Sequence, residues 1–145
     1  MDPADRLVEQ FKSGRSTADH TDKMEKCKRD SLGEEVPFIG LEAPAGTLIG
    51  WVAICVTAGA VELMWIETKK GRENKKRGDQ MLKELCNLAD KWGVALTLQA
   101  APWDEAKLDA LIDWYEKNGF VLDAPPRNHT RYQRMTRKPR TNGNR

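Results

Sequence analysis

The stretch "VELMWIETKKGRENKKRGDQMLKELCNLADKWGVALTLQA", Val61 to Ala100, decides the fold class. It opens with a run rich in β-formers and continues with apolar residues at helical spacing from Met81 to Trp92. After Gly93 a second β-rich run follows. A strand, a helix and a strand in this order form a crossover, which makes the two strands parallel. We therefore predict a parallel β-α-β unit whose helix ends at Gly93.

The residues before this unit predict an antiparallel arrangement. Three β-rich runs, "EVPFIGLEA", "TLIGWVAICV" and "VELMWIET", are separated by the short turn sequences "PAG" and "TAGA". Tight turns place consecutive strands side by side and antiparallel. The predicted fold class is α/β, with a mixed sheet that starts as an antiparallel meander, continues as a parallel β-α-β unit and is flanked by helices.

The two ends of the chain complete this organisation. Residues 1–34 predict two polar helices: the first carries Leu7, Val8 and Phe11 at helical spacing, and the second covers residues 18–30. Residues 101–120 predict a further helix that ends at Asn118-Gly119, and residues 131–137 predict a last strand. We expect one domain over residues 1–137, with variable N-terminal helices over residues 1–34, and a basic tail over residues 138–145 that is disordered by composition.

The composition excludes several classes of protein. A chain of 145 residues with a net charge of +2 fits one domain and does not predict a uniformly basic surface. It has no apolar run of roughly 20 residues and no secretory signal, so we expect no membrane association. The three cysteines are far apart and the histidines number two, so neither disulfides nor a metal site are expected. These features predict a cytoplasmic protein.

Two features leave alternatives open. Glu62 interrupts an apolar run, and it lies either at a strand end in water or in a cleft, where it could act as a general base. The stretch "RENKKRGDQ", Arg72 to Gln80, precedes the helix. It is either a phosphate-binding loop, a nucleic-acid contact or a solvated turn, because a loop that enters a helix N-terminus favours anions. Asp79 would compete for the same backbone N–H groups as a helix cap.

The segment "ALIDWYEKNGF", Ala110 to Phe120, resembles the signature A-I-x-x-Y-E-K-x-G-F of the GNAT superfamily of acyl-CoA N-acyltransferases. The order of the predicted elements agrees with this resemblance over about Thr47 to Met135. The resemblance implies a GNAT-like fold and an acetyl-CoA-dependent N-acetyltransferase. It also implies that Tyr115 protonates the departing CoA thiolate.

The resemblance also assigns a role to the stretch before the helix. The family's pyrophosphate loop reads Q/R-x-x-G-x-G/A. Placing Gly78 at the last position puts Lys76 at the first glycine and Glu73 at Q/R. A rival alignment places Gly78 at the first glycine. In both alignments the loop departs from the family pattern, and the resemblance implies pyrophosphate binding by Lys75, Lys76, Arg77 and Gly78.

Glu62 falls where several members of the family carry a glutamate general base. The backbone of Ile66, Glu67 and Thr68 falls where the family's fourth strand contacts the pantetheine arm and the thioester. In the family, a separation between this strand and the next one holds acyl-CoA. The chain departs from the family at Leu108, where an asparagine is common, and the family's first strand is not visible in the sequence.

Two functions follow from these features. The first is transfer of an acetyl group from acetyl-CoA to the primary amine of a small molecule or a protein, by direct attack in a ternary complex, with a homodimer as a further association to consider. The second is an inactive binding protein with the same fold. The acid-free basic run from Arg127 to Arg145 would then contact an acidic or nucleic-acid partner, unless it is only a solubilising terminus.

Overall fold

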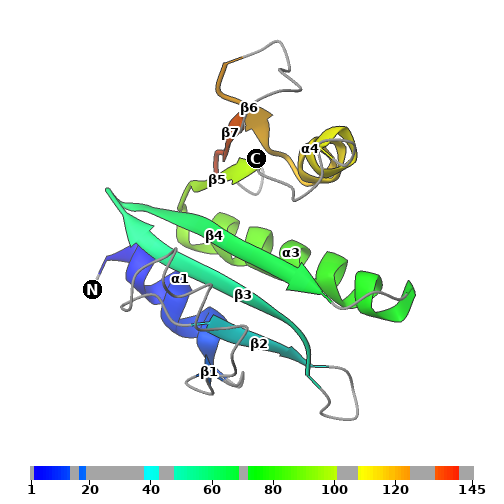
Figure 1. The fold of residues 1–145 in the computed structure, drawn as a ribbon. Coiled ribbons are helices and arrows are strands. Elements are labelled where there is room, and N and C mark those ends of the chain that lie inside the picture. Colours follow the sequence, from blue (N-terminus) through cyan, green and yellow to red (C-terminus); the bar gives the residue numbers. More distant parts are fainter. Residues whose placement is uncertain are drawn as a thin grey trace.

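One mixed sheet organises the computed structural model, which describes residues 2–13, 17–18, 38–42, 48–68, 72–100, 108–124 and 133–140. The sheet has seven strands in the order β1-β2-β3-β4-β5-β7-β6 (Figure 1). The strands are β1 (Thr17–Ala18), β2 (Phe38–Glu42), β3 (Leu48–Thr57), β4 (Ala60–Thr68), β5 (Leu96–Ala100), β6 (Val121–Leu122) and β7 (Gln133–Arg137). The described helices are α1 (Pro3–Lys12), α3 (Arg72–Trp92) and α4 (Leu108–Lys117).

The strand directions confirm the predicted fold class. Strands β2, β3 and β4 pair antiparallel, and the turn between β3 and β4 carries Ala58 and Gly59 with positive φ, as a two-residue hairpin requires. Strands β4 and β5 pair parallel across the crossover through α3. The predicted last strand is β7, antiparallel to β5, and the two-residue strand β6 beside it was not predicted.

The predicted helical faces are buried in one core. On α1, Leu7 and Phe11 are fully buried, and on α3 the buried residues include Met81, Leu82 and Leu85, as their spacing predicts. Helix α1 contacts α3 and strand β3. The prediction of a second N-terminal helix is wrong at Ala18, which lies in β1, and its remaining residues, 19–30, lie outside the described segments of the chain.

The stretch Arg72 to Gln80 is not a loop, as was predicted, because α3 begins at Arg72. Most of its residues are good helix formers, and adding residues to an existing helix costs little once the buried turns from Met81 onward are formed. Gly78 is buried, and Asp79 accepts a hydrogen bond of 2.6 Å from Trp114 Nε1 on α4. These tertiary contacts offset the roughly 1 kcal/mol by which glycine disfavours a helix interior.

Glycines end two helices as predicted. Gly93 follows α3 with φ +66°, and Gly119 follows α4 with φ +95°. Phe120 is buried, and its ring lies 5.6 Å from the Tyr115 ring, so the chain packs back on α4. Among the described helices, none combines the length and the apolar composition that crossing a membrane requires.

Candidate active site

Strands β4 and β5 separate before either of them ends. Their parallel pairing covers only Val61 with Leu96, Glu62 with Thr97 and Leu63 with Leu98, although β4 continues to Thr68 and β5 to Ala100. Figure 1 shows β5, β7, β6 and α4 together in the upper part of the view, away from the end of β4. On its β5 side, the later half of β4 therefore presents backbone groups that β5 does not pair.

A β-bulge in β4 lies at the point of separation. Ile54 of β3 pairs with Leu63, whereas Ala53 pairs with Trp65, so Met64 has no partner on β3. An extra residue bends a strand and increases its local twist. The bulge at Met64 therefore gives a physical reason for β4 to leave β5 directly after Leu63. The alternation of apolar and polar residues along the strand carries no clear signal for this bulge.

Glu62 lies beside the point where the strands separate, on the sheet face opposite the buried Val61 and Leu63. Its side chain is 22% exposed, and its Oε1 is 4.0 Å from Arg134 Nη2 on β7. The structure excludes a fully solvated strand end for Glu62, and the position of Glu62 in a cleft remains a prediction. It is a half-buried carboxylate with one loosely placed cation beside it.

Tyr115 lies in the last turn of α4 and is only 4% exposed. Its ring is packed between Trp114 and Phe120, with centroid distances of 5.1 and 5.6 Å. Burial raises the pKa of the Tyr115 phenol well above its ordinary value, because the phenolate would lose its hydration. The group is therefore protonated across the physiological pH range.

The cations expected to bind phosphate lie in the first turns of α3. Lys75 and Lys76 are exposed, whereas Arg77 is half-buried and donates a hydrogen bond of 3.2 Å to Gln80. In a helix that begins at Arg72, the backbone N–H groups of Lys76, Arg77 and Gly78 point to carbonyls one turn earlier. Binding of an anion by these three amides is therefore excluded, and the side chains of Lys75 and Lys76 are the groups that extend into solvent.

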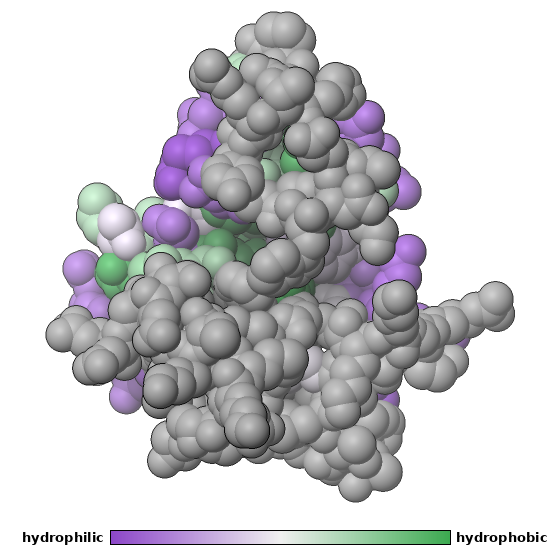
Figure 2. Space-filling view, in the orientation of Figure 1, coloured by the Kyte–Doolittle hydropathy of each residue, from purple (hydrophilic) through white to green (hydrophobic). Residues whose placement is uncertain are grey.

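The apolar and polar surfaces near the sheet are distributed unevenly. Described residues in the middle of the face in Figure 2 are mostly apolar, and hydrophilic residues surround them.

One buried polar atom on β7 has no hydrogen-bond partner among the described residues. This atom is Oε1 of Gln133, a residue that pairs with Ala100 at the end of β5.

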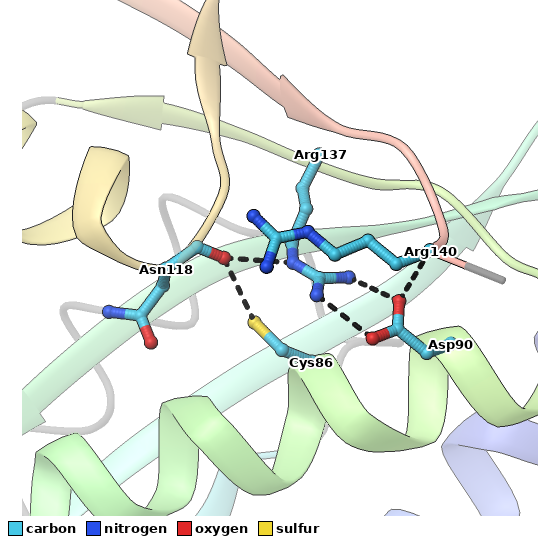
Figure 3. Close-up of polar contacts among 5 residues, drawn as sticks. All are labelled: Cys86, Asp90, Asn118, Arg137 and Arg140. Carbon is cyan, nitrogen blue, oxygen red and sulfur yellow. Dashed lines mark hydrogen bonds and ion pairs between the residues drawn. The ribbon is translucent and has the colours of Figure 1, made fainter. Parts of the chain in front are cut away.

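A second polar cluster joins α3, α4 and β7 (Figure 3). Arg137 is buried and donates to both carboxylate oxygens of Asp90, at 2.8 and 3.0 Å, and its Nε donates to the Asn118 carbonyl at 2.8 Å. Asp90 also accepts a 2.7 Å bond from the Arg140 backbone N–H. The Cys86 thiol donates to the same Asn118 carbonyl at 3.8 Å.

The electrostatics of this second cluster indicate a structural role. Burial would raise the pKa of Asp90, but the hydrogen bonds from Arg137 and Arg140 hold it below its ordinary value. Burial raises the pKa of the Cys86 thiol, and the nearby Arg137 only partly offsets it, so the thiol is not an activated nucleophile. Arg137 and Arg140 belong to the basic run after Arg127, and some of that run is therefore engaged within the domain. Residues 141–145 lie outside the described segments.

The architecture matches solved acetyltransferases. A Bacillus subtilis acetyltransferase in complex with CoA aligns with a TM-score of 0.61 and 16% identity over 86% of this chain and 97% of that chain. An aminoglycoside 6′-acetyltransferase type Ii aligns with a TM-score of 0.59 and 16% identity over 95% and 90%. The PaiA N-acetyltransferase from Thermoplasma acidophilum, in complex with coenzyme A, aligns with a TM-score of 0.53 and 23% identity over 79% and 68%.

These similarities identify the architecture of the chain. The protein has the GNAT fold, as the resemblance of the sequence implied. No protein family model matches the sequence, and no curated protein is significantly similar to it. The predicted roles of Glu62, Tyr115, the Ile66–Thr68 backbone and the α3 cations are tested by no comparison and remain predictions.

Proposed function

We propose that this protein transfers an acetyl group from acetyl-CoA to a primary amine. The observation that carries the proposal is the separation of β4 from β5 after Leu63, with the bulge at Met64 directly beside it. This geometry leaves a row of β4 backbone groups without partners on β5, which a linear donor with amide groups can pair. Similarly folded acetyltransferases with CoA support the same donor class.

The proposed reaction takes place in a ternary complex. Glu62 accepts a proton from the acceptor ammonium, directly or through water, and the freed amine attacks the thioester carbonyl. A new C–N bond forms, the C–S bond breaks, and a backbone N–H near Ile66 stabilises the developing oxyanion. The products are an acetamide, CoA thiol and one proton. The half-buried position of Glu62 beside the strand separation supports this role.

Tyr115 is proposed to donate its proton to the departing thiolate. Its buried phenol is protonated throughout the physiological range, as a general acid must be before transfer. Its high pKa makes it a weak acid, so the donation accompanies the growth of charge on sulfur rather than preceding it. The last turn of α4 and its Gly119 end hold the ring in a fixed place between Trp114 and Phe120.

The nucleotide end of the donor is proposed to lie at the start of α3. The helix dipole favours an anion there, and the exposed side chains of Lys75 and Lys76 add charge-assisted contacts. Three cations in the first turns are unfavourable for an isolated helix because they repel the positive end of its dipole. A bound phosphate would remove that repulsion. Gly78 contributes as a buried helical residue that lets α3 and its surroundings pack closely.

The test is titration calorimetry of the intact protein with acetyl-CoA and with CoA. We expect saturable binding below high micromolar concentration, and no heat at that concentration would exclude the proposal. Tyr115→Phe should lower kcat by about 10²-fold while acetyl-CoA affinity stays within about twofold. Tyr132→Phe, which removes the same hydroxyl from the other tyrosine of the chain, serves as the control.

A second candidate is a binding protein that uses the same fold without catalysis. The helical conformation of Arg72 to Gln80 favours it, because the residues aligned with the family's pyrophosphate loop, Glu73 to Gly78, lie in α3 instead of in a loop. The test is a salt-dependent gel shift with RNA and DNA, which the combined variant Lys138→Gln, Arg140→Gln and Arg145→Gln should weaken. Substitution is used instead of deletion, since the Arg140 amide is bonded to Asp90. No shift at low salt excludes nucleic acid as the partner.

A further inference from the structure

Two side chains of opposite charge meet on the sheet face that carries Glu62. Arg134 of β7 pairs in register with Gln99 of β5, two residues beyond Thr97, which pairs with Glu62, so Arg134 and Glu62 are on the same face of the sheet. The Glu62 and Arg134 side chains approach to 4.0 Å and are 22% and 49% exposed. An ion pair with this solvent exposure and this separation contributes little to stability. Each side chain can therefore exchange its partner for a group of a ligand at a small cost in free energy.

The other side of Glu62 carries two sulfur-containing side chains, and the hydroxyl of the exposed Thr57 lies 3.6 Å from one of them, Cys55. Cys55 lies directly opposite Glu62 on β3, and its sulfur is 3.2 Å from the sulfur of Met64, the bulge residue. A thioether and a cysteine sulfur together form a soft, polarizable surface that suits an aliphatic or aromatic group. The sheet face therefore offers a carboxylate in the middle, a guanidinium on one side and two sulfur atoms on the other.

We infer that the acceptor is an α-amino acid with an apolar side chain. Its ammonium would replace Arg134 as the partner of Glu62, and its carboxylate would pair with the Arg134 guanidinium. Its side chain would contact Cys55 and Met64. The ammonium and carboxylate of an α-amino acid are attached to the same carbon, so they fit a charged pair only 4.0 Å apart. This inference depends on the proposed acetyl transfer.

The same arrangement argues against polycationic acceptors. A second ammonium near Glu62 would meet the Arg134 guanidinium, and like charges that close repel each other. Among the described residues, Asp123 also lies close to this face, where it accepts a 2.7 Å hydrogen bond from Thr136. The transfer itself converts a zwitterion and acetyl-CoA into an N-acetyl amino acid anion, CoA thiol and one proton.

The test compares four acceptors with the intact wild-type protein, by mass spectrometric detection of the acetylated product. We expect L-phenylalanine to have the highest kcat/KM. It should exceed 2-phenylethylamine, which lacks the carboxylate, and L-serine, which lacks the apolar group, each by about tenfold or more. Spermidine should be the poorest acceptor. Equal values for L-phenylalanine and 2-phenylethylamine, or a preference for spermidine, would overturn the inference.

Two variants then assign the preference to Arg134. Arg134→Gln should raise KM for L-phenylalanine about tenfold with little change in kcat, and should leave 2-phenylethylamine unaffected. Arg134→Glu should shift the preference toward spermidine. Lys117→Gln also removes one positive charge, at an exposed site on α4. It should change neither the preference for L-phenylalanine over 2-phenylethylamine nor the preference for L-phenylalanine over spermidine. If Arg134→Gln leaves the ratio of the two acceptors unchanged, the inference is wrong.

Calorimetry with acetyl-CoA separates the two ways in which these experiments could fail. Retained acetyl-CoA binding with acetyl transfer to amines of another class overturns the acceptor assignment and leaves the proposed function intact. Absence of acetyl-CoA binding in the wild type overturns both. Thermal melts of each variant identify any loss of folding.

Discussion

Glu62 lies one residue before the last pair that β4 and β5 form, and this position determines its chemistry. The carboxylate is half-buried, and its closest described cation, Arg134, is loosely placed. A carboxylate in such a place reaches both the strand separation and the polar sheet face. In the proposed reaction, Glu62 would therefore lie between the acetyl donor and the amine acceptor.

Glu62→Gln should lower kcat by roughly 10²- to 10⁴-fold, because an amide has no basic oxygen that can accept the proton of the amine. The affinity for acetyl-CoA should change little, since the residue is not proposed to contact the donor's phosphates. Stopped-flow or steady-state assays of CoA release measure the effect. Glu9→Gln, at an exposed position of α1, is the matched control. Unchanged turnover would remove Glu62 from the mechanism.

Gly119 and Gly93 form a natural pair for testing what a helix-ending glycine does. Both have positive φ, but a Cβ on Gly93 would meet nothing within 4 Å, whereas one on Gly119 would lie 2.6 Å from Arg140 Nη2. Gly93→Ala should cost about 1 kcal/mol of unfolding free energy from backbone strain alone. Gly119→Ala should cost more, because Arg140 must also move.

Urea unfolding of the two glycine variants measures this difference. Combining Gly119→Ala with Arg140→Ala should lower the cost of the glycine substitution but leave it above that of Gly93→Ala, because a Cβ at position 119 still lies 3.1 Å from Arg137 Nε. An identical cost at both positions in the presence of Arg140 would contradict the contact with Gly119.

Among the elements, α3 differs most from expectation. It extends from Trp92 back to Arg72, where a loop was predicted, and so its N-terminus reaches nine residues further than the apolar pattern that begins at Met81. The consequence is electrostatic. Lys75 and Lys76 project from the first turns of a helix instead of from a loop that can wrap around a phosphate.

Replacing Lys75 and Lys76 together by glutamine should weaken acetyl-CoA binding about three- to tenfold at low salt, and less at high salt, because exposed charges are screened. Binding of S-acetylpantetheine, which lacks the nucleotide phosphates, should not change. Calorimetry at two salt concentrations tests both points. Lys83→Gln, an exposed residue further along the same helix, is the control. Equal weakening for both donors would remove these lysines from phosphate binding.

At the scale of the whole molecule, the Asp90–Arg137 pair connects segments that are distant in sequence. It joins the end of α3, the end of α4 and the last strand through Asn118 and the Arg140 amide (Figure 3). A buried guanidinium that loses its carboxylate partner leaves an uncompensated charge, which is strongly destabilising. The pair therefore fixes α4, and with it Tyr115, against the sheet.

Asp90→Asn should lower the free energy of unfolding by about 2–3 kcal/mol near neutral pH, less than the roughly 3–5 kcal/mol of a fully buried pair because Asp90 is 22% exposed. The folded pKa of Asp90 lies below the unfolded one, so its stabilisation is complete above about pH 4–5 and is lost as the pH falls through the folded value. The difference between wild type and variant should shrink in that acidic window.

Chemical unfolding from pH 7 to pH 2.5 measures this dependence. Asp2→Asn is the control, because Asp2 is exposed and makes no side-chain capping bond. A difference that stays constant down to the lowest pH would contradict the ionic character of the pair.

The sequence by itself determined β2, β3, β4, β5 and β7, the buried helix faces and the parallel crossover, because hydrophobic periodicity and glycine positions act locally. It did not predict the two-residue strands β1 and β6. The "YEKNGF" end of α4 was also predictable from these residues. Only the tertiary structure decided how far α3 extends, since the burial of Gly78 and the bond from Trp114 to Asp79 depend on packing against α4. The bulge at Met64, the separation of β4 from β5 and the Glu62–Arg134 contact join residues from different strands. The pairing register sets these contacts, and a linear pattern does not contain it.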